Sequence, residues 1–259
     1  MRFSILLAAI LTFAALTAFA APRETGFLNR TVTVDGTIYK FVVFVPADYT
    51  PEKKWPIVLF LHGAGERGDE GSLQTDTGIG TALRRHPDRY PAVVVMPQCR
   101  PSKNWNEPAM QAQALAALEQ SAKEFNGDPD RTYLTGLSLG GYGTWALAAA
   151  KPGKFAAIAP VCGGVVPPPG SRNLLPQSTE EDPYSAAAAK IGKTPVWIFH
   201  GDADKSVPVT ESQKMNAAMK ALGGDVHYTE YPGVPHNSWD KAYAEPEFPA
   251  WLFAQRLQK

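Results

Sequence analysis

Residues 131–143 read Arg-Thr-Tyr-Leu-Thr-Gly-Leu-Ser-Leu-Gly-Gly-Tyr-Gly, and this segment is the strongest indication of the fold class. A serine stands between two glycines, directly after a strand-like run and directly before a helix-like one. A serine in so tight a turn has a strained backbone, and the residues two before and two after it must lack side chains. Gly136 and Gly140 meet that need. The sequence therefore predicts a turn that holds the Ser138 hydroxyl clear of a sheet, with the Leu139 amide pointing toward a bound carbonyl oxygen.

Strand-like apolar runs alternate with helix-like stretches on both sides of this turn. Strands are expected over 56–61, 92–96, 132–135, 155–160, 196–200 and 226–231, and helices over 107–125, 140–150, 210–222 and 249–257. Ahead of them, residues 31–45 alternate apolar and polar residues about Asp35-Gly36, which predicts an antiparallel hairpin. The pattern indicates an α/β fold, with a mostly parallel central sheet, an N-terminal antiparallel hairpin and helices on both faces.

The first 20 residues have the features of an export signal. Arg2 precedes an apolar stretch over 5–18, and Ala18-Phe19-Ala20 is a small-x-small cleavage site. The alternative is an uncleaved anchor, which the shortness of the stretch disfavours. We expect an exported protein, periplasmic or extracellular, with a single domain over 21–259 and no membrane span in the mature chain. Residues 163–192 are Pro-rich and irregular, and we interpret them as a partial lid.

Charge and cysteine content narrow the classes of partner. The chain has 25 basic and 25 acidic residues and no strongly basic stretch, so nucleic acid and anionic membranes are poor candidates. Cys99 and Cys162 are its two cysteines. An oxidising compartment would permit a disulfide between them. Each follows an expected strand, however, and those strands are not neighbours in the expected sheet, which favours two buried free thiols.

A serine hydroxyl is a weak nucleophile, so it needs a histidine to take its proton and an acid to orient that histidine. His236 lies beyond the last expected strand and is the candidate base, because the other histidines have ordinary structural readings. Asp202 and Asp204 both follow the preceding strand. Asp204 lies further past the strand end, where the loop can turn back toward His236, whereas Asp202 suits a brace of that loop.

A developing oxyanion needs two backbone N–H donors. Leu139 offers one, and His62-Gly63-Ala64-Gly65 after the 56–61 run predicts the other at the Ala64 amide. The alternative is a glycine-rich strand exit without a role. Trp105 and Trp239 follow strand ends and are candidates for substrate contact, although loop aromatics are often simply packed. This chemistry requires no metal and no organic cofactor.

With these residues the chain resembles the α/β-hydrolase superfamily, in particular the esterases and predicted peptidases related to dienelactone hydrolases, phospholipase/carboxylesterases and prolyl-oligopeptidase catalytic domains. The matching stretches are residues 61–68, 96–99, 135–145, 160–164, 195–204, 207–208 and 236–239. The resemblance implies Ser138 as nucleophile, Asp204 as acid and His236 as base. The Pro-rich stretch after Gly164 departs from the family pattern.

The function expected from these residues is hydrolysis of carboxylic esters through an acyl-enzyme, on a small-molecule or polymer substrate. A peptidase of the prolyl-oligopeptidase type, a polyester or polysaccharide-ester depolymerase, and a non-catalytic binding protein on the same fold are the alternatives. Binding proteins on such a fold typically lose a member of the catalytic triad, and all three candidates are present here.

Overall fold

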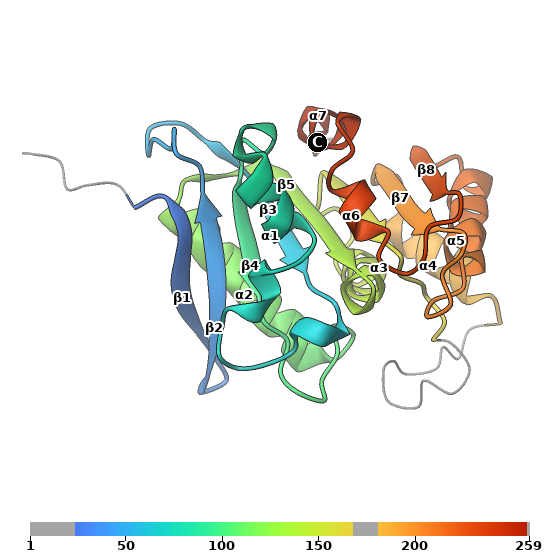
Figure 1. The fold of residues 1–259 in the computed structure, drawn as a ribbon, viewed down its shortest axis with the longest axis horizontal. Coiled ribbons are helices and arrows are strands. Elements are labelled where there is room, and N and C mark those ends of the chain that lie inside the picture. Colours follow the sequence, from blue (N-terminus) through green and yellow to red (C-terminus); the bar gives the residue numbers. More distant parts are fainter. Residues whose placement is uncertain (1–23, 168–180, 258–259) are drawn as a thin grey trace, which may run out of the picture.

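The computed structural model describes residues 24–167 and 181–257, which form one eight-stranded sheet covered by helices (Figure 1). The strands are β1 (Gly26–Val34), β2 (Thr37–Val45), β3 (Trp55–Leu61), β4 (Val93–Pro97), β5 (Gly127–Leu137), β6 (Ala157–Val161), β7 (Val196–Gly201) and β8 (Val226–Tyr231). Their order is β1-β2-β4-β3-β5-β6-β7-β8. The β1–β2 and β2–β4 pairs are antiparallel and the remaining pairs are parallel, which confirms the predicted fold class.

The N-terminal hairpin forms at the predicted turn. Val34 pairs with Thr37, so Asp35 and Gly36 alone connect the two strands. Both residues have positive φ, 49° for Asp35 and 75° for Gly36. A two-residue turn of this kind matches the right-handed twist of the strands that it joins, and Asp-Gly is among the pairs that adopt it most readily.

The helices cover both faces of the sheet. They are α1 (Ile79–Arg85), α2 (Pro108–Glu124), α3 (Leu139–Ala150), α4 (Pro183–Ile191), α5 (Thr210–Ala221), α6 (Trp239–Ala242) and α7 (Glu247–Ala254). Buried side chains of α2 to α5 pack on one face, and those of α1, α6 and α7 on the other. The last helix ends at Ala254, so its predicted extension to residue 257 is wrong.

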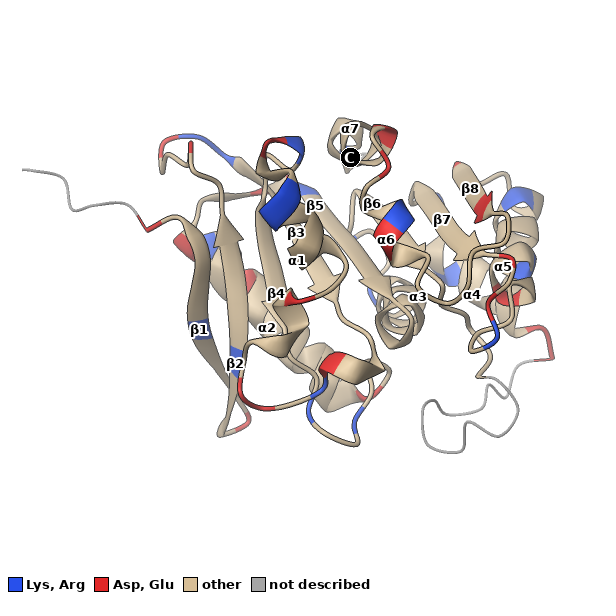
Figure 2. Ribbon diagram, viewed as in Figure 1, with Lys and Arg blue, Asp and Glu red and all other residues tan. Residues whose placement is uncertain are grey.

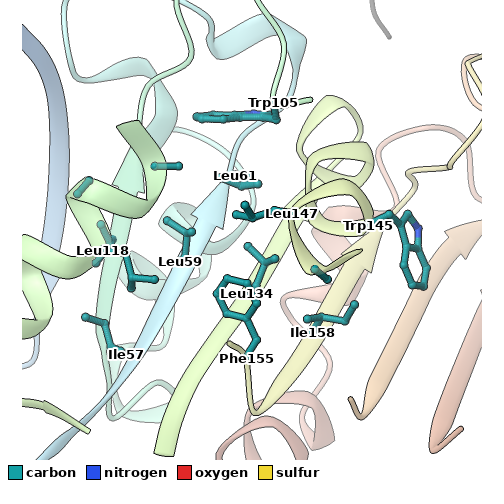
Figure 3. Packing of buried hydrophobic residues seen from close by; sticks show 14 of the residues in the cluster. Ile57, Leu59, Leu61, Trp105, Leu118, Leu134, Trp145, Leu147, Phe155 and Ile158 are labelled. Carbon is teal, nitrogen blue, oxygen red and sulfur yellow. The ribbon is translucent and has the colours of Figure 1, made fainter. Parts of the chain in front are cut away.

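Successive residues of the central strands point to opposite faces and so supply both layers of the core. In β3, Ile57, Leu59 and Leu61 join the cluster beneath α2 and α3, whereas Val58 and Phe60 join the cluster on the opposite face. Figure 3 shows the first cluster, with leucines of β3 and β5 meeting Leu118 of α2 and Leu147 of α3. All seven residues of β3 are buried, as its unbroken apolar run predicts.

Part of the segment expected to be irregular forms a helix. Asp182 caps α4 by accepting hydrogen bonds from the amides of Tyr184 and Ser185, and Pro183 occupies the first turn. Four alanines follow at 186–189, so capping residues and a strong helix-forming run were both visible in the sequence. The middle of the expected lid, residues 168–180, and the expected export signal, residues 1–20, lie outside the described residues.

The described residues also show whether a helix could span a membrane, how charge is distributed and whether the cysteines are paired. Within residues 24–167 and 181–257, no helix has the length and apolar character needed to cross a bilayer. Basic and acidic residues are interspersed along the ribbon (Figure 2). Cys99 and Cys162 are both buried and free, and they follow strands that β3 and β5 separate in the sheet.

Candidate active site

The turn between β5 and α3 has the strained geometry predicted for it. Ser138 has φ 52° and ψ −115°, in the positive-φ region that side chains rarely tolerate. A Cβ atom at Gly136 would lie 2.4 Å from the carbonyl oxygen of Gly140, and one at Gly140 would lie 1.8 Å from the carbonyl oxygen of Leu61. Glycine at both positions therefore lets the turn close, and the Ser138 amide donates to the Val161 carbonyl at 2.9 Å.

Three side chains from the loops after β5, β7 and β8 form one hydrogen-bonded chain. The Ser138 hydroxyl lies 2.8 Å from Nε2 of His236, and Nδ1 of His236 lies 2.6 Å from Oδ2 of Asp204. The imidazole is a quarter exposed and the carboxyl group is fully buried. The structure thus brings together the serine, histidine and Asp204 that the sequence analysis selects, at the carboxyl edge of the parallel strands.

Asp204 is held as an anion by the groups around it. Its Oδ1 accepts hydrogen bonds from the amides of Ser206 and Val207, at 2.8 and 2.9 Å. Burial alone would raise its pKa, but hydrogen bonds from His200, His236 and the Val207 amide outweigh burial and hold the pKa of Asp204 well below its usual range. A permanently charged carboxylate can accept the Nδ1–H of His236 and stabilise the imidazolium that forms when His236 takes a proton.

A second histidine supports this carboxylate, and the sequence analysis missed it. The buried His200 lies at the end of β7, with Nε2 3.2 Å from Oδ2 of Asp204 and 3.1 Å from the Val207 carbonyl oxygen. Two acceptors at Nε2 require the proton there, so Nδ1 accepts from the Ser212 hydroxyl at 2.7 Å. The spacing of His200 and Asp204 around a strand end was the available signal, but it predicts proximity without a direction.

Asp202, the other candidate acid, does not contact His236 through any described hydrogen bond but braces a neighbouring loop. Asp202 is exposed, and its Oδ1 accepts a hydrogen bond from the Gly233 amide at 2.6 Å. Gly233 begins the short loop that carries His236, so Asp202 ties the acid loop to the base loop. This contact matches the bracing role considered for Asp202.

The predicted oxyanion residues flank the nucleophile. Leu139 is the first residue of α3, where helix amides have no acceptor within the helix and favour an anion. A Cβ atom at Gly63 would lie 3.7 Å from the Cβ of Ser138, so the loop after β3 runs beside the serine. Ala64 follows Gly63 and opens a short 3-10 helix, Ala64–Glu66. The Arg67 guanidinium donates to the Ala64 carbonyl at 3.0 Å and steadies this loop.

The two predicted substrate-contacting tryptophans differ in position. Trp105 is 1% exposed, its indole donates to the His62 carbonyl at 3.0 Å, and it lies across the end of β3 (Figure 3). In this buried position the ring supports the loop that carries Ala64, and its contact with substrate stays a prediction. Trp239 is half-buried, with its ring edge-on to His236 at 5.3 Å, and its contact with substrate stays a prediction.

His62 fixes the same loop from within. Its Nδ1 lies 2.6 Å from the Gly63 carbonyl oxygen, and its Nε2 accepts from the Cys99 amide at 2.9 Å. This arrangement needs a neutral ring with its proton on Nδ1, because a proton on Nε2 would face the amide hydrogen. Burial lowers the pKa of His62 to about 4, despite the favourable hydrogen bond to Gly63.

We therefore expect the stability of the protein to fall as the pH drops from 6.5, the ordinary histidine pKa, toward 4. In that window His62 is protonated in the unfolded chain but not in the folded chain, so the free energy of unfolding decreases as the pH falls. The total decrease over the whole window is about 3 kcal/mol. Urea unfolding near pH 7.5 and near pH 4.5 measures the change. His62→Gln keeps an acceptor for the Cys99 amide but does not titrate, so its pH-dependent loss should be smaller. An equal loss in both proteins would contradict the prediction.

Two members of the triad and a nearby cysteine have the spacing of a metal site. Ligand atoms of Cys162, Asp204 and His236 lie within 4.8 Å of one another. Metals bind the thiolate form of cysteine, and burial raises the pKa of Cys162 far above its usual range. Asp204 and His236 also bond each other directly. A cation would thus have to break the triad and ionise a buried thiol, so these residues fit a metal poorly.

Comparison with known proteins points to one family. A family model described as "Putative esterase" matches residues 35–245. A solved thermostable esterase superposes with a TM-score of 0.76 at 34% identity, over 89% of this chain and 63% of that one. A "Putative carboxymethylenebutenolidase" of Methylorubrum extorquens is 31% identical over 57% of this chain and 49% of its own length. A "Probable feruloyl esterase C" of Aspergillus flavus is 26% identical over 63% of this chain and 62% of its own.

These matches confirm the predicted resemblance to α/β-hydrolases. The chain spans about half to three fifths of the length of the two curated relatives described above.

Proposed function

The chain belongs to the Esterase family, and from this premise we propose that it is an exported serine hydrolase that cleaves carboxylic esters through an acyl-enzyme. Ser138 is the nucleophile, His236 the general base and Asp204 the orienting acid. The observation that carries the proposal is the continuous chain of hydrogen bonds at 2.8 and 2.6 Å that links these three side chains. Export rests on the leader-like sequence of residues 1–20.

In the acylation step, the Ser138 oxygen attacks the ester carbonyl carbon while its proton passes to Nε2 of His236. The carbonyl electrons move onto the oxygen, and the amides of Leu139 and Ala64 stabilise that charge. The tetrahedral intermediate collapses as His236 returns the proton to the departing alcohol. Water then repeats the sequence on the acyl group, which releases the carboxylic acid and restores the Ser138 hydroxyl.

A peptidase is the main alternative with the same chemistry, and polymer ester hydrolysis is a second. Matched p-nitrophenyl acetate and p-nitroacetanilide separate ester from amide cleavage at one acyl group. We expect rapid release of p-nitrophenol and little release of p-nitroaniline, because the family and its relatives point to ester substrates. Faster cleavage of the anilide, or no cleavage of short esters, would contradict the proposal. A series of longer acyl groups, with acetylated and feruloylated sugars, then defines the substrate.

A further inference from the structure

His200 is a polar side chain near the end of an apolar, buried strand. All six residues of β7 are buried, and His200 has the same parity along the strand as Val196 and Ile198, so its ring points to the sheet face that α5 covers. Taking an imidazole out of water costs free energy unless its nitrogens are paired, and both nitrogens of this ring have partners. Those partners indicate what the ring does.

Contacts on both sides of the ring place its proton. Nε2 lies 3.2 Å from Oδ2 of Asp204 and 3.1 Å from the Val207 carbonyl oxygen, and an ionised carboxylate and a carbonyl can only accept. On the other side, the Ser212 hydroxyl of α5 is buried, and among residues 24–167 and 181–257 its one described acceptor is Nδ1 of His200, at 2.7 Å. A buried hydroxyl that donates to Nδ1 leaves the single ring proton on Nε2, so His200 is a neutral donor to Asp204.

Oδ2 of Asp204 therefore receives two N–H groups, one from each histidine. The bond from Nδ1 of His236 is the shorter, at 2.6 Å, and the bond from His200 is the longer, at 3.2 Å. The charge of this oxygen attracts the imidazolium that forms when His236 takes the serine proton. A second donor stabilises the carboxylate independently of His236, so it reduces the attraction of Asp204 for that imidazolium.

We propose that His200 is a positioning residue, whose N–H holds Asp204 in place and shares its charge, and thereby limits how strongly His236 retains a proton. The proposal rests on the proposed function, because His236 acts as a base only where Ser138 must lose its proton. A ring with a merely structural role at this position would stabilise the protein, but it would not affect the pH at which the base becomes available.

Four other titratable groups lie near this pair of bonds. Cys162 approaches from the end of β6, Tyr142 from α3, Glu230 from β8, and Asp202 from the loop that also carries the catalytic acid. Burial raises the pKa of Cys162 and of Tyr142 far above their usual ranges, so both stay neutral where a histidine titrates. Hydrogen bonds from two neighbouring side chains lower the pKa of Glu230, so it stays charged there. All four groups are retained in the variants below, which therefore differ in the bond to Asp204.

The test is a pair of amide variants that differ by one methylene. The amide of His200→Gln reaches the position of Nε2 and can donate to Asp204, whereas the amide of His200→Asn reaches only the position of Nδ1, beside Ser212. The free enzyme's base sets the acid limb of kcat/KM, which p-nitrophenyl acetate measures between about pH 5 and pH 9. We expect this limb to lie about half a pH unit or more higher in His200→Asn, and within about 0.2 unit of wild type in His200→Gln.

The sign of the shift follows from the chemistry of the base. His236 must be neutral to accept the serine proton, and a carboxylate with one donor fewer holds the imidazolium proton up to higher pH. KM should change by less than about twofold in both variants, because His200 does not contact substrate. Circular dichroism at each pH verifies that the variants are folded.

Phe199→Leu is the matched control. Phe199 is the preceding residue of β7 and is fully buried, but it packs on the opposite face of the sheet, against Phe248. This variant should lose stability and leave the acid limb where it is in wild type. An acid limb at the same pH in wild type, His200→Asn and His200→Gln would overturn the positioning role alone, as would an equal shift in Phe199→Leu. A wild-type protein that hydrolyses no ester would overturn the proposed function.

The tautomer of His200 is tested in the wild-type protein, whether or not the variants fold and whether or not the protein is active. Long-range ¹⁵N–¹H correlation spectra of protein labelled at the histidine nitrogens distinguish a ring with its proton on Nε2 from one with its proton on Nδ1. The signals of His200 are those missing from the spectrum of either variant or, by elimination, those left when the other four histidines are assigned. We expect the proton on Nε2, and a proton on Nδ1 would overturn the proposal.

Discussion

Alanine in place of Ser138 is expected to lower kcat on p-nitrophenyl acetate by on the order of 10⁶-fold, the scale seen when a serine nucleophile is removed. The Ser138 oxygen is the atom that forms the acyl bond, and its partner at 2.8 Å is the candidate base. Without it, only the oxyanion donors and substrate binding remain to favour hydrolysis by water. Steady-state rates and labelling by a fluorophosphonate probe, followed by peptide mass analysis, measure the loss.

Ser138→Gly provides a control for backbone strain. Alanine keeps the φ of 52° as costly as serine does, whereas glycine adopts it freely. Both variants should be inactive, but the glycine variant should be more stable, by about 1 kcal/mol. The nucleophile assignment is wrong if the alanine variant keeps more than a few per cent of wild-type activity, or if the probe labels a different serine.

Much of the fold could be predicted because its signals are local. The apolar runs of β3, β4 and β7 carry no charged residue, and each of these three strands lies within about a residue of its predicted bounds, whereas β5 begins five residues before the predicted 132–135. The hairpin followed from Asp35-Gly36, whose backbone preference does not depend on the rest of the protein. The short helices α1 and α6 were not predicted, because a few residues give too little periodicity to recognise.

The candidate site also has a part that local sequence signals predict and a part that they do not. The spacing of Gly136, Ser138 and Gly140 identifies the nucleophile turn. The order of the remaining candidates along the chain then selects Asp204 and His236. The contact of His200 with Asp204 depends on how the loop after β7 folds back, and the approach of Cys162 depends on how β6 packs beside β7, and residue spacing specifies neither. The burial of Trp105 could not be predicted either: it follows a strand end, but its loop packs the side chain against Gly143, where an added Cβ would lie 2.4 Å from the Trp105 Cβ.

Asparagine in place of Asp204 is expected to lower kcat by about 10⁴-fold, the scale measured for the equivalent change in a serine protease. The carboxylate receives donors on both oxygens: two backbone amides at Oδ1, and the two histidines at Oδ2. Asparagine has one accepting oxygen and one donating NH2 group. Its NH2 group must therefore face either the two backbone amides or the two histidines, which are themselves donors. If the NH2 group faces His236, the ring moves its proton to Nε2 and can no longer accept the Ser138 proton.

Asp202→Asn is the matched control for this change, two residues away in the same loop. Its single described side-chain bond is accepted from the Gly233 amide, and an asparagine oxygen can accept the same bond. We expect this variant to keep kcat within about tenfold of wild type and to lose little stability, because exposed substitutions of this kind have small effects. Measuring kcat and KM for both variants on one short ester, with circular dichroism to verify folding, separates the two acids. A large loss of kcat in Asp202→Asn with a small one in Asp204→Asn would reverse the assignment, and equal losses would mean that the loop, not a particular carboxylate, sets the activity.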